Sequence, residues 1–246
     1  VSTPNVSLIT KMGDLPDYPY HLIDMSKYSA MDIENGKSVS FQTSRGCPFS
    51  CNFCGNPQLN QNTWRAMPIA KIVSKIEILQ SVYGFNNFLF LDDCTSHNIG
   101  HFREFLNALN NLKKKIRWTT VGLRADLIVK MTNADLQLMI NSGCMAIELG
   151  VESGSERILK FINKAESKDV IIQANLKLAS FPVKVKYNFV IGFPTETASE
   201  VDETIDFYKR LSLDNHNAYP MIFVYTPIAG TQLFNEALKH GLIAPE

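Results

Sequence analysis

The stretch that decides the fold is "SVSFQTSRGCPFSCNFCGNP", residues 38–57, in which an alternating segment leads directly into three closely spaced cysteines. The alternation of apolar and polar side chains over residues 38–44 predicts a β-strand. Cys47, Cys51 and Cys54 follow with C-x3-C-x2-C spacing, and three such thiolates suit a soft metal. A structural zinc site would need a fourth ligand, and the sequence offers no obvious second ligand pair nearby.

Downstream of this stretch, strand-like and helix-like segments alternate along the chain. Strict alternation predicts a parallel sheet with right-handed crossovers. Six such units fit either an open doubly wound sheet or an incomplete barrel. The predicted strands cover residues 38–44, 86–93, 116–126, 145–154, 185–193 and 219–227. The predicted helices cover residues 68–84, 101–115, 132–143, 155–164, 168–181, 197–211 and 231–241.

Two of the predicted helices open with capping boxes, Thr132 with Asp135 and Thr197 with Glu200. Residues 1–37 show no clear period and are rich in Pro, Asp and Tyr. We therefore expect residues 1–37 to be a linker or N-terminal extension and residues 38–246 to form the β/α domain.

The bulk composition indicates a globular protein and no particular macromolecular partner. The 246 residues are 45% apolar and 20% charged, with a formal net charge of zero. Without a basic excess, nothing in the charge indicates nucleic acid or an anionic membrane. No apolar run approaches the roughly 18 residues of a membrane span, and the N-terminus lacks a signal-peptide layout. We expect a cytoplasmic protein.

The three clustered cysteines allow several metal sites. Short cysteine runs often hold an iron–sulfur cluster, and three protein ligands on a [4Fe–4S] cluster leave one iron open. An open position is typical of a catalytic metal. The alternatives are zinc completed by Cys94 or His97, and an electron-transferring cluster completed by Cys94. Outside such sites, Cys94 and Cys144 are expected to be small buried apolar residues.

Polar residues fall at the predicted strand ends, where parallel β/α folds bind their ligands. Because the ends of parallel strands share one rim, a single common site is the better interpretation. After the cysteines, these residues are Asp92, Asp93, Arg124, Asp126, Glu152, Ser153, Gly192, Pro194, Thr195, Thr226, Pro227 and Gly230.

The cysteine spacing after the first strand of a β/α series, with the aromatic Phe53 just before Cys54, resembles the radical S-adenosylmethionine (SAM) superfamily. The resemblance runs from about residue 38 to residue 240. It implies a partial (β/α)6 barrel, similar to a TIM barrel, in which the three cysteines hold a [4Fe–4S] cluster. It also implies that SAM chelates the open iron and is cleaved by one electron to a 5′-deoxyadenosyl radical.

Further motifs resemble the branch of this superfamily that usually carries an N-terminal cobalamin-binding domain. They are "LPDYPYHLIDMSKY", "FLDDCTSH", "GLRAD", "ELGVESGSERILKFINK", "NFVIGFPTET" and "TPIAGTQLF". That branch includes methyltransferases and an anaerobic cyclase. The usual D-x-H-x-x-G cobalamin signature is absent from these 246 residues. A cobalamin-binding domain is therefore expected outside this chain, upstream of Val1.

The resemblance implies cobalamin-dependent methyl transfer or a related radical cyclisation on a small organic substrate. A reductant such as flavodoxin or ferredoxin would supply the electron. The rivals are a cobalamin-independent radical SAM enzyme and, from another class, an iron–sulfur electron carrier or redox sensor. A zinc-stabilised interaction domain is a third rival.

The resemblance also implies roles for individual residues toward SAM. Asp92 and Asp93 would accept from the ammonium group, and Glu152 with Ser153 would bind the ribose hydroxyls. Lys164 and Arg124 would face the carboxylate, while the backbone at Gly192 would approach adenine. Tyr225 would stack or hydrogen-bond within the site. Each residue has a structural alternative, such as a helix cap, an ion pair or core packing.

Overall fold

Six parallel strands form one sheet in the computed structural model, which describes residues 7–28 and 37–244. The order β1-β4-β5-β6-β7-β8 follows the chain, and every neighbouring pair is parallel. Because all six strands run in the same direction, all their carboxyl ends meet at one rim. The strands are Ser38–Phe41 (β1), Asn87–Leu91 (β4), Arg117–Leu123 (β5), Cys144–Glu152 (β6), Lys184–Ile191 (β7) and Ala218–Val224 (β8).

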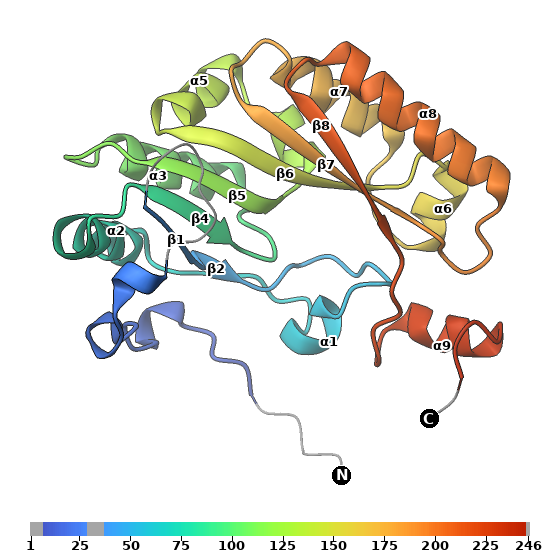
Figure 1. The fold of residues 1–246 in the computed structure, drawn as a ribbon, viewed down its shortest axis with the longest axis horizontal. Coiled ribbons are helices and arrows are strands. Elements are labelled where there is room, and N and C mark those ends of the chain that lie inside the picture. Colours follow the sequence, from blue (N-terminus) through green and yellow to red (C-terminus); the bar gives the residue numbers. More distant parts are fainter. Residues whose placement is uncertain (1–6, 29–36, 245–246) are drawn as a thin grey trace.

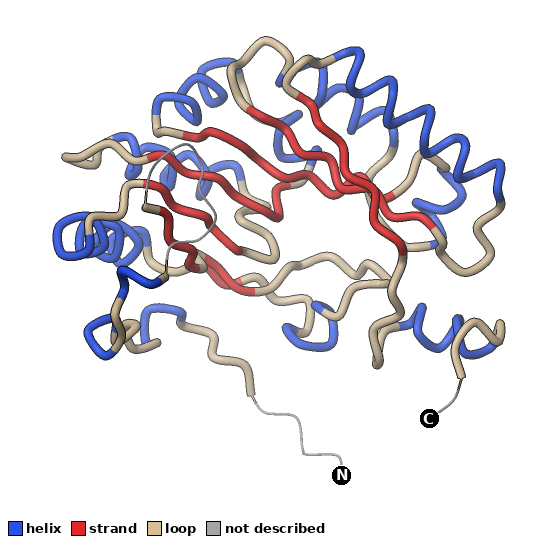
Figure 2. The backbone as a smooth tube through the Cα atoms, viewed as in Figure 1, coloured by secondary structure: helices blue, strands red, loops and turns tan. Residues whose placement is uncertain are grey.

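The helices lie mainly along one face of a curved sheet, while the opposite face looks toward the loops that follow the strands (Figure 1). Figure 2 shows the same arc of strands with helices outside it. This arrangement confirms the predicted α/β class and incomplete barrel. The helices are Asn56–Asn60 (α1), Ile69–Tyr83 (α2), Ile99–Asn110 (α3), Ala125–Lys130 (α4), Asn133–Asn141 (α5), Glu156–Phe161 (α6), Lys168–Leu178 (α7), Ala198–Asp214 (α8) and Gln232–Lys239 (α9).

The main core lies between the sheet and the helices. Aromatic side chains of β1, β4, α3 and β5 pack edge to face or tilted there, with ring centroids 5.4–6.1 Å apart. Burying such large apolar side chains is the main favourable term in folding. The central group consists of Phe41, Phe90, Phe105 and Trp118.

Both predicted capping boxes are present, at the starts of α5 and α8. In each box the threonine hydroxyl accepts from the backbone N–H of the third helical residue, whose carboxylate accepts in return. The carboxylate of each box has a second use, since Asp135 of α5 also binds Arg103 of α3. Glu200 also binds Arg157 and Ser155 at α6, so the cap joins two helices.

Three details of the sequence prediction were wrong. The first strand ends at Phe41 rather than at residue 44, and a separate two-residue strand follows (Ser44–Arg45, β2). This β2 pairs antiparallel with Arg65–Ala66 (β3). The helix predicted to residue 115 ends at Asn110, before the lysine run. The short helices α1 and α4 were not predicted, because neither is long enough to show a helical period.

The described part of the N-terminal extension packs on α2 and the first strands. Met12 and Met25 are buried in the main core. The Lys71 ammonium group of α2 donates to the carbonyl oxygen atoms of Gly13 and Leu15. The extension includes three short 3-10 turns, at Met12–Asp14, Tyr20–Leu22 and Met25–Lys27. The division of the chain at residue 37 stays a prediction.

Strand β8 forms one edge of the sheet and leaves apolar side chains exposed. Met221, Ile222 and Phe223 are each more than 40% exposed, and Val224 is 74% exposed. Pro220, within the same strand, cannot donate a backbone hydrogen bond. Within the described ranges, no helix is long and apolar enough to span a membrane.

A buried amide connects α7, β7 and the end of α8. Asn175 of α7 is fully buried, and its Oδ1 accepts from the Tyr187 hydroxyl at 2.9 Å and from Asn215 Nδ2 at 3.1 Å. Its Nδ2 donates to the carbonyl oxygen of Leu211 at 3.0 Å. Buried polar groups are costly when left without partners, so this one side chain satisfies three others.

We expect Asn175→Ala to lower the free energy of unfolding by about 2–4 kcal/mol, because three buried polar groups lose a partner. Tyr187→Phe removes only one hydroxyl and should cost about 1 kcal/mol. Urea unfolding of both variants and of the double variant measures the two costs and their coupling. Equal costs for the two single variants would show that Asn175 is not the centre of this group.

Candidate functional site

The three clustered cysteines lie on the loop between β2 and α1, as free and partly exposed thiols. Asn52, within this loop, anchors it on the far side of the rim. Its backbone N–H donates to the carbonyl oxygen of Ile162 at 2.9 Å, and its carbonyl accepts from the N–H of Leu233 at 3.1 Å. The loop therefore reaches from the first strands across to α6 and α9.

The acids at the end of β4 fix the start of this loop. Asp92 is 2% exposed, and its carboxylate accepts from the backbone N–H groups of Thr43 and Ser44 and from the Thr43 hydroxyl. Asp93 is exposed, and its Oδ2 accepts from the N–H of Gly46 at 2.8 Å. Both carboxylates brace the cysteine loop in the structure. Their contact with the ammonium group of SAM stays a prediction.

Gly46 permits the turn directly before Cys47. Its φ is +82°, and a Cβ there would lie 2.1 Å from the carbonyl oxygen of Thr63. Only glycine tolerates both the left-handed backbone and this close approach. The exit angle of the chain toward the first thiol therefore depends on this residue.

The thiols differ in their electrostatic surroundings. A hydrogen bond from the neighbouring Cys94 thiol, against an opposing effect of burial, lowers the pKa of Cys47 to about 7. The Arg124 and Lys164 charges act in the same direction. Burial raises the pKa of Cys51 to about 11 and also raises that of Cys54. The Asn56 backbone N–H approaches the Cys54 sulfur at 3.4 Å.

A buried ion-pair network lies beside the loop, at the ends of β5 and β6. Lys164 Nζ is 3.0 Å from Glu152 Oε1 and 3.7 Å from Glu166 Oε2. Burial alone would lower the pKa of Lys164, but the charges of Glu152 and Glu166 outweigh it and raise that pKa. Arg124 is 3.3 Å from both Glu166 and Asp126. The two cations are thus paired with protein carboxylates, and their contact with SAM stays a prediction.

Arg124 also connects this network to the cysteine loop. Its guanidinium carbon lies 3.6 Å from the centroid of the Phe49 ring, between the first two cysteines. A guanidinium over an aromatic face is a cation–π contact, which is stronger where water is excluded. The network therefore supports the loop by packing as well as by charge.

Gly150 makes room for the central ion pair. A Cβ at this position would lie 2.3 Å from Glu152 Oε1 and 2.9 Å from Lys164 Nζ. Glu152 itself has a φ of +68°, at an irregularity in the register of β6 with β7. An unfavourable backbone conformation in a non-glycine residue persists only where its surroundings hold it. Here Lys164 binds the side chain of Glu152, and the pairing of Glu152 with Phe189 of β7 holds its backbone.

Aromatic rings connect the cysteine loop to the ends of β7 and β8. The Phe53 ring lies 5.7 Å from Phe193, which lies 5.1 Å from Tyr225. These rings join a small separate core with residues of α6 and α9. Gly192, just before Phe193, is exposed with a φ of +84°. The contacts of Phe53, Gly192 and Tyr225 with a cofactor stay predictions.

Ser153 is the predicted site residue that the structure does not bring to this group. Its side chain is fully buried, and its hydroxyl lies 3.2 Å from that of Thr204 in α8. The backbone N–H of Ser155 also donates to it. The Ser153 side chain therefore fixes β6 to α8, and a ribose contact would require it to turn away from both.

Glu166 and Phe49 were missed in the sequence, whereas Cys94 was named only as a fourth ligand in the alternative metal sites. Glu166 pairs with both buried cations, Phe49 stacks under Arg124, and the Cys94 thiol lies beside Cys47. Glu166 lies between two predicted helices, and nothing in the surrounding sequence indicates that its side chain is buried. Cys94 follows the two acids of β4, so its place at the rim could have been inferred from topology.

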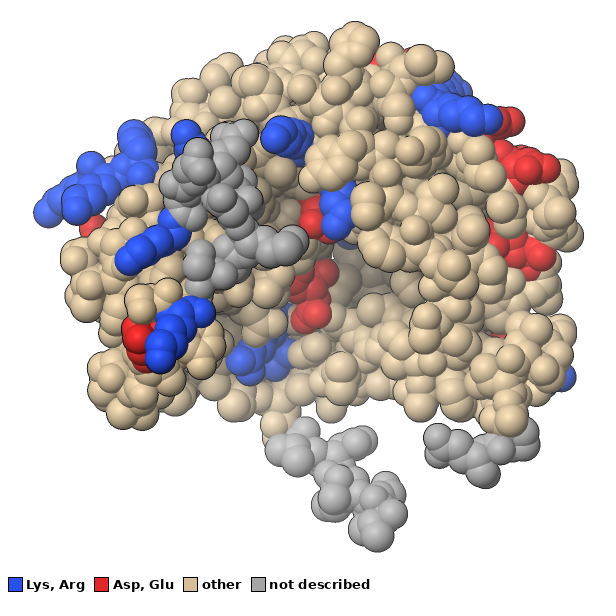
Figure 3. All heavy atoms as spheres, viewed as in Figure 1, with Lys and Arg blue, Asp and Glu red and all other residues tan. Residues whose placement is uncertain are grey.

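The face in Figure 3 is hollowed near its centre, and acidic and basic side chains lie along the edge of this hollow. Among the described residues, no group of three or more His, Cys, Asp or Glu side chains could hold a metal ion as they stand. The three thiols are nevertheless the right donors for an iron–sulfur cluster, which cysteine thiolates hold. The N–H near Cys54 and the nearby cations are features that stabilise anionic sulfur.

The sequence from residue 41 to residue 208 matches the family described as the radical SAM superfamily. The chain belongs to this superfamily. Membership in the radical SAM superfamily implies a [4Fe–4S] cluster and SAM as cofactors, and the donor set on the cysteine loop fits the cluster. Cys47, Cys51 and Cys54 are the residues that would hold it.

Curated radical SAM relatives extend over the whole chain. An uncharacterised methyltransferase of Pyrococcus horikoshii is 32% identical over 240 residues, which are 98% of this chain and 50% of that protein. The cytidylyl-2-hydroxyethylphosphonate methyltransferase of Streptomyces wedmorensis is 25% identical, over 100% of this chain and 47% of that protein. The chain therefore spans about half the length of these relatives.

Solved structures confirm the fold. The radical SAM methyltransferase TsrM of Kitasatospora setae, determined with cobalamin and a [4Fe–4S] cluster bound, superposes with a TM-score of 0.69 at 15% identity. The match covers 83% of this chain and 37% of TsrM. At 15% identity, this similarity supports only the shared partial-barrel fold.

The burial of Asp92 leads to a prediction about pH. Burial raises the pKa of Asp92 from 3.8 to about 6. The folded state therefore holds a proton that the unfolded state releases, and stability falls as the pH rises from about 4 to about 6. At 1.36 kcal/mol per pKa unit, the loss is at most about 3 kcal/mol. Asp92→Asn should not show this fall in stability between about pH 4 and about pH 6. Urea unfolding of the wild type and the variant at several pH values measures the difference. A parallel pH dependence in the two proteins would contradict the assignment.

We expect Gly150→Ala to lower the free energy of unfolding by about 1–3 kcal/mol, because the new methyl group overlaps the Glu152–Lys164 ion pair. The control is Gly55→Ala, where a Cβ would meet only Ile228, at 3.8 Å. Thermal unfolding of the two variants gives the comparison. If Gly55→Ala lost as much stability as Gly150→Ala, overlap with the ion pair would not be the cause of the loss.

Proposed function

We propose that this chain is the catalytic domain of an enzyme that cleaves SAM reductively at a [4Fe–4S] cluster held by Cys47, Cys51 and Cys54. The observation that carries the proposal is the cysteine loop itself. It presents three free thiols, it is braced by Asp92 and Asp93, and it lies beside a buried network of paired charges. The cluster and SAM together supply a 5′-deoxyadenosyl radical when bound.

The residues around the loop would orient the cofactors and restrict the access of water. The aromatic group of Phe53, Phe193 and Tyr225 covers one side of the loop with apolar surface. Glu152 and Lys164 provide one carboxylate and one ammonium group at the rim, already fixed by each other. Side chains held in this way lose little entropy when a ligand binds, which favours a defined geometry for the reacting atoms.

We further propose that the full protein uses this chemistry in cobalamin-dependent methyl transfer, or in a related radical cyclisation, on a small organic substrate. Four matched relatives are named methyltransferases, and another is named an anaerobic magnesium-protoporphyrin IX monomethyl ester cyclase. TsrM is described with cobalamin bound. A cobalamin would be bound by a domain outside this chain, and a flavodoxin or ferredoxin would be the electron donor.

The cluster assignment predicts the outcome of anaerobic reconstitution with iron and sulfide. The protein should take up about four irons per chain, the content of one [4Fe–4S] cluster. SAM should change the spectrum of the reduced cluster, and dithionite with SAM should release 5′-deoxyadenosine. Cys51→Ala should lose the cluster and abolish this release.

The matched control is Cys144→Ala, which alters a buried cysteine at the start of β6 and away from the loop. It should keep the iron content and the release of 5′-deoxyadenosine. A colourless protein with one bound zinc would contradict the cluster. A cluster whose spectrum does not respond to SAM would favour an electron carrier.

A further inference from the structure

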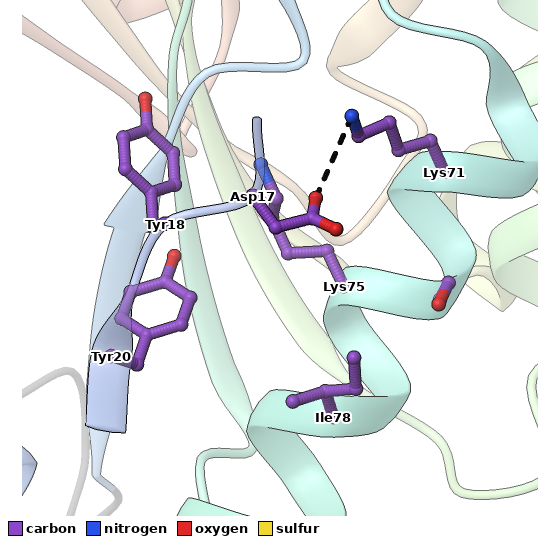
Figure 4. A pocket seen from close by; sticks show the side chains of 7 residues that line it. Asp17, Tyr18, Tyr20, Lys71, Lys75 and Ile78 are labelled. Carbon is purple, nitrogen blue, oxygen red and sulfur yellow. Dashed lines mark ion pairs between the residues drawn. The ribbon is translucent and has the colours of Figure 1, made fainter. Parts of the chain in front are cut away.

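A second pocket lies between the N-terminal extension and α2, at the β1 end of the sheet. Figure 4 shows its smaller part, where Tyr18 and Tyr20 of the extension face side chains of α2. The larger part has a volume of about 210 Å³ and the smaller part about 80 Å³. Both parts are lined by Asp17, Tyr18, Lys71 and Lys75.

Lys75 of α2 is a buried cation in this pocket. Its side chain projects from α2, and the residue is only 6% exposed. Its Nζ lies 4.6 Å from the centroid of the Tyr18 ring and 5.1 Å from that of Phe41, and its hydrogen-bond contact is the Met67 sulfur at 3.9 Å. Among the described residues, no carboxylate forms an ion pair with it. Burial accordingly lowers the pKa of Lys75.

Two further cations line the larger part of the pocket. Lys71 is occupied, since it binds two backbone carbonyl oxygens and lies 3.6 Å from the carboxylate of Asp17. Arg45 is only partly occupied. Its Nε donates to Gln42 at 3.1 Å, and within residues 7–28 and 37–244 its terminal nitrogens have no partner. Lys71, Lys75 and Arg45 thus face the single carboxylate of Asp17, which leaves an excess of two positive charges in the pocket lining.

A buried ammonium group without a counter-ion is unfavourable, because desolvation is not offset by an opposite charge. Apart from Asp17, which is exposed and already paired, the pocket walls offer no carboxylate. The remaining walls are the aromatic rings and the apolar side chains of Met12, Leu15 and Met67. The pocket therefore matches a ligand with a negatively charged end and a carbon portion.

We propose that this pocket binds an oxyanion, the phosphate or carboxylate group of a small molecule, with Lys75 and Arg45 as its main partners. The site is separate from the residues proposed to hold the cluster and SAM. It is nevertheless close to them in sequence, because Arg45 belongs to β2, just before the cysteine loop. An anion here would fix the N-terminal extension against α2 and β2.

Isothermal titration calorimetry of the full-length protein at constant ionic strength tests the proposal, with inorganic phosphate, phenyl phosphate and benzoate as probes. At least one probe should bind saturably. Lys75→Met should weaken that binding about 10- to 100-fold, as expected when a charged hydrogen bond is lost. Lys113→Met removes a charge at an exposed position outside the pocket and should leave the affinity unchanged.

The relative affinities of the three probes identify the chemical source of the anion. Equal binding of inorganic and phenyl phosphate supports a free phosphate ion, and tighter binding of phenyl phosphate supports an organic ester. Preference for benzoate supports a carboxylic acid. The absence of saturable binding by all three probes, or an unchanged affinity in Lys75→Met, would overturn the proposal.

Thermal unfolding shows whether a loss of binding in Lys75→Met comes from the missing charge or from a folding defect. Because Lys75 is surrounded by Tyr18, Phe41 and Met67, a methionine there removes an unpaired charge and keeps the packing. Without anion, the melting temperature of Lys75→Met should equal or exceed that of the wild type. The binding probe should raise the melting temperature of the wild type and not that of the variant. A variant that melts several degrees lower without anion would show that the charge is already compensated.

Discussion

The hydrogen bonds that Asp92 accepts from Thr43 and Ser44 are the constraint on which the site depends. They join the end of β4 to the chain that leaves β1, so the position of the cysteine loop is set by the sheet. Asp93 extends this connection to Gly46, and Asn52, between the second and third cysteines, joins the loop to α6 and α9. A flexible segment with three thiols would lose considerable entropy on binding a cluster. Here most of that ordering is provided by folding.

The charges next to the loop follow the same pattern. Glu152, Lys164, Glu166 and Arg124 are buried together, and each has at least one partner of opposite sign. Such a network contributes little net stability compared with apolar packing, but removing one member leaves an unpaired buried charge. The network therefore contributes to the site by holding its side chains in a fixed geometry and by setting the local electrostatic potential. The pKa of Cys47 is lowered mainly by the hydrogen bond from Cys94, and the Arg124 and Lys164 charges of the network add a smaller effect in the same direction.

Sequence reasoning was most successful for features with a regular period and for local motifs. The six strands, the long helices and both capping boxes were predicted because hydrophobic periodicity and cap residues are written in adjacent positions. The cysteine loop was predicted from the spacing of its cysteines and from their place directly after the first strand. The roles of Asp92 and Ser153 depend on which way a side chain turns at the end of a strand. The direction of each side chain is set by a hydrogen-bond partner 48 or more positions away in the sequence. A local sequence pattern carries no information on such contacts. Glu166 was missed for the same reason.

The sheet ends at β8 without closing, and this edge determines how the fold can be extended. A strand with free backbone groups and exposed Met221, Phe223 and Val224 can accept another strand or an apolar surface. Pro220 removes one backbone donor and so makes the first part of the edge a poorer template than the last. Additions to this scaffold are therefore favoured next to the carboxyl end of β8, close to the rim. A barrel that stays open can in this way change the size of its mouth without any change in the six strands that hold the cysteine loop.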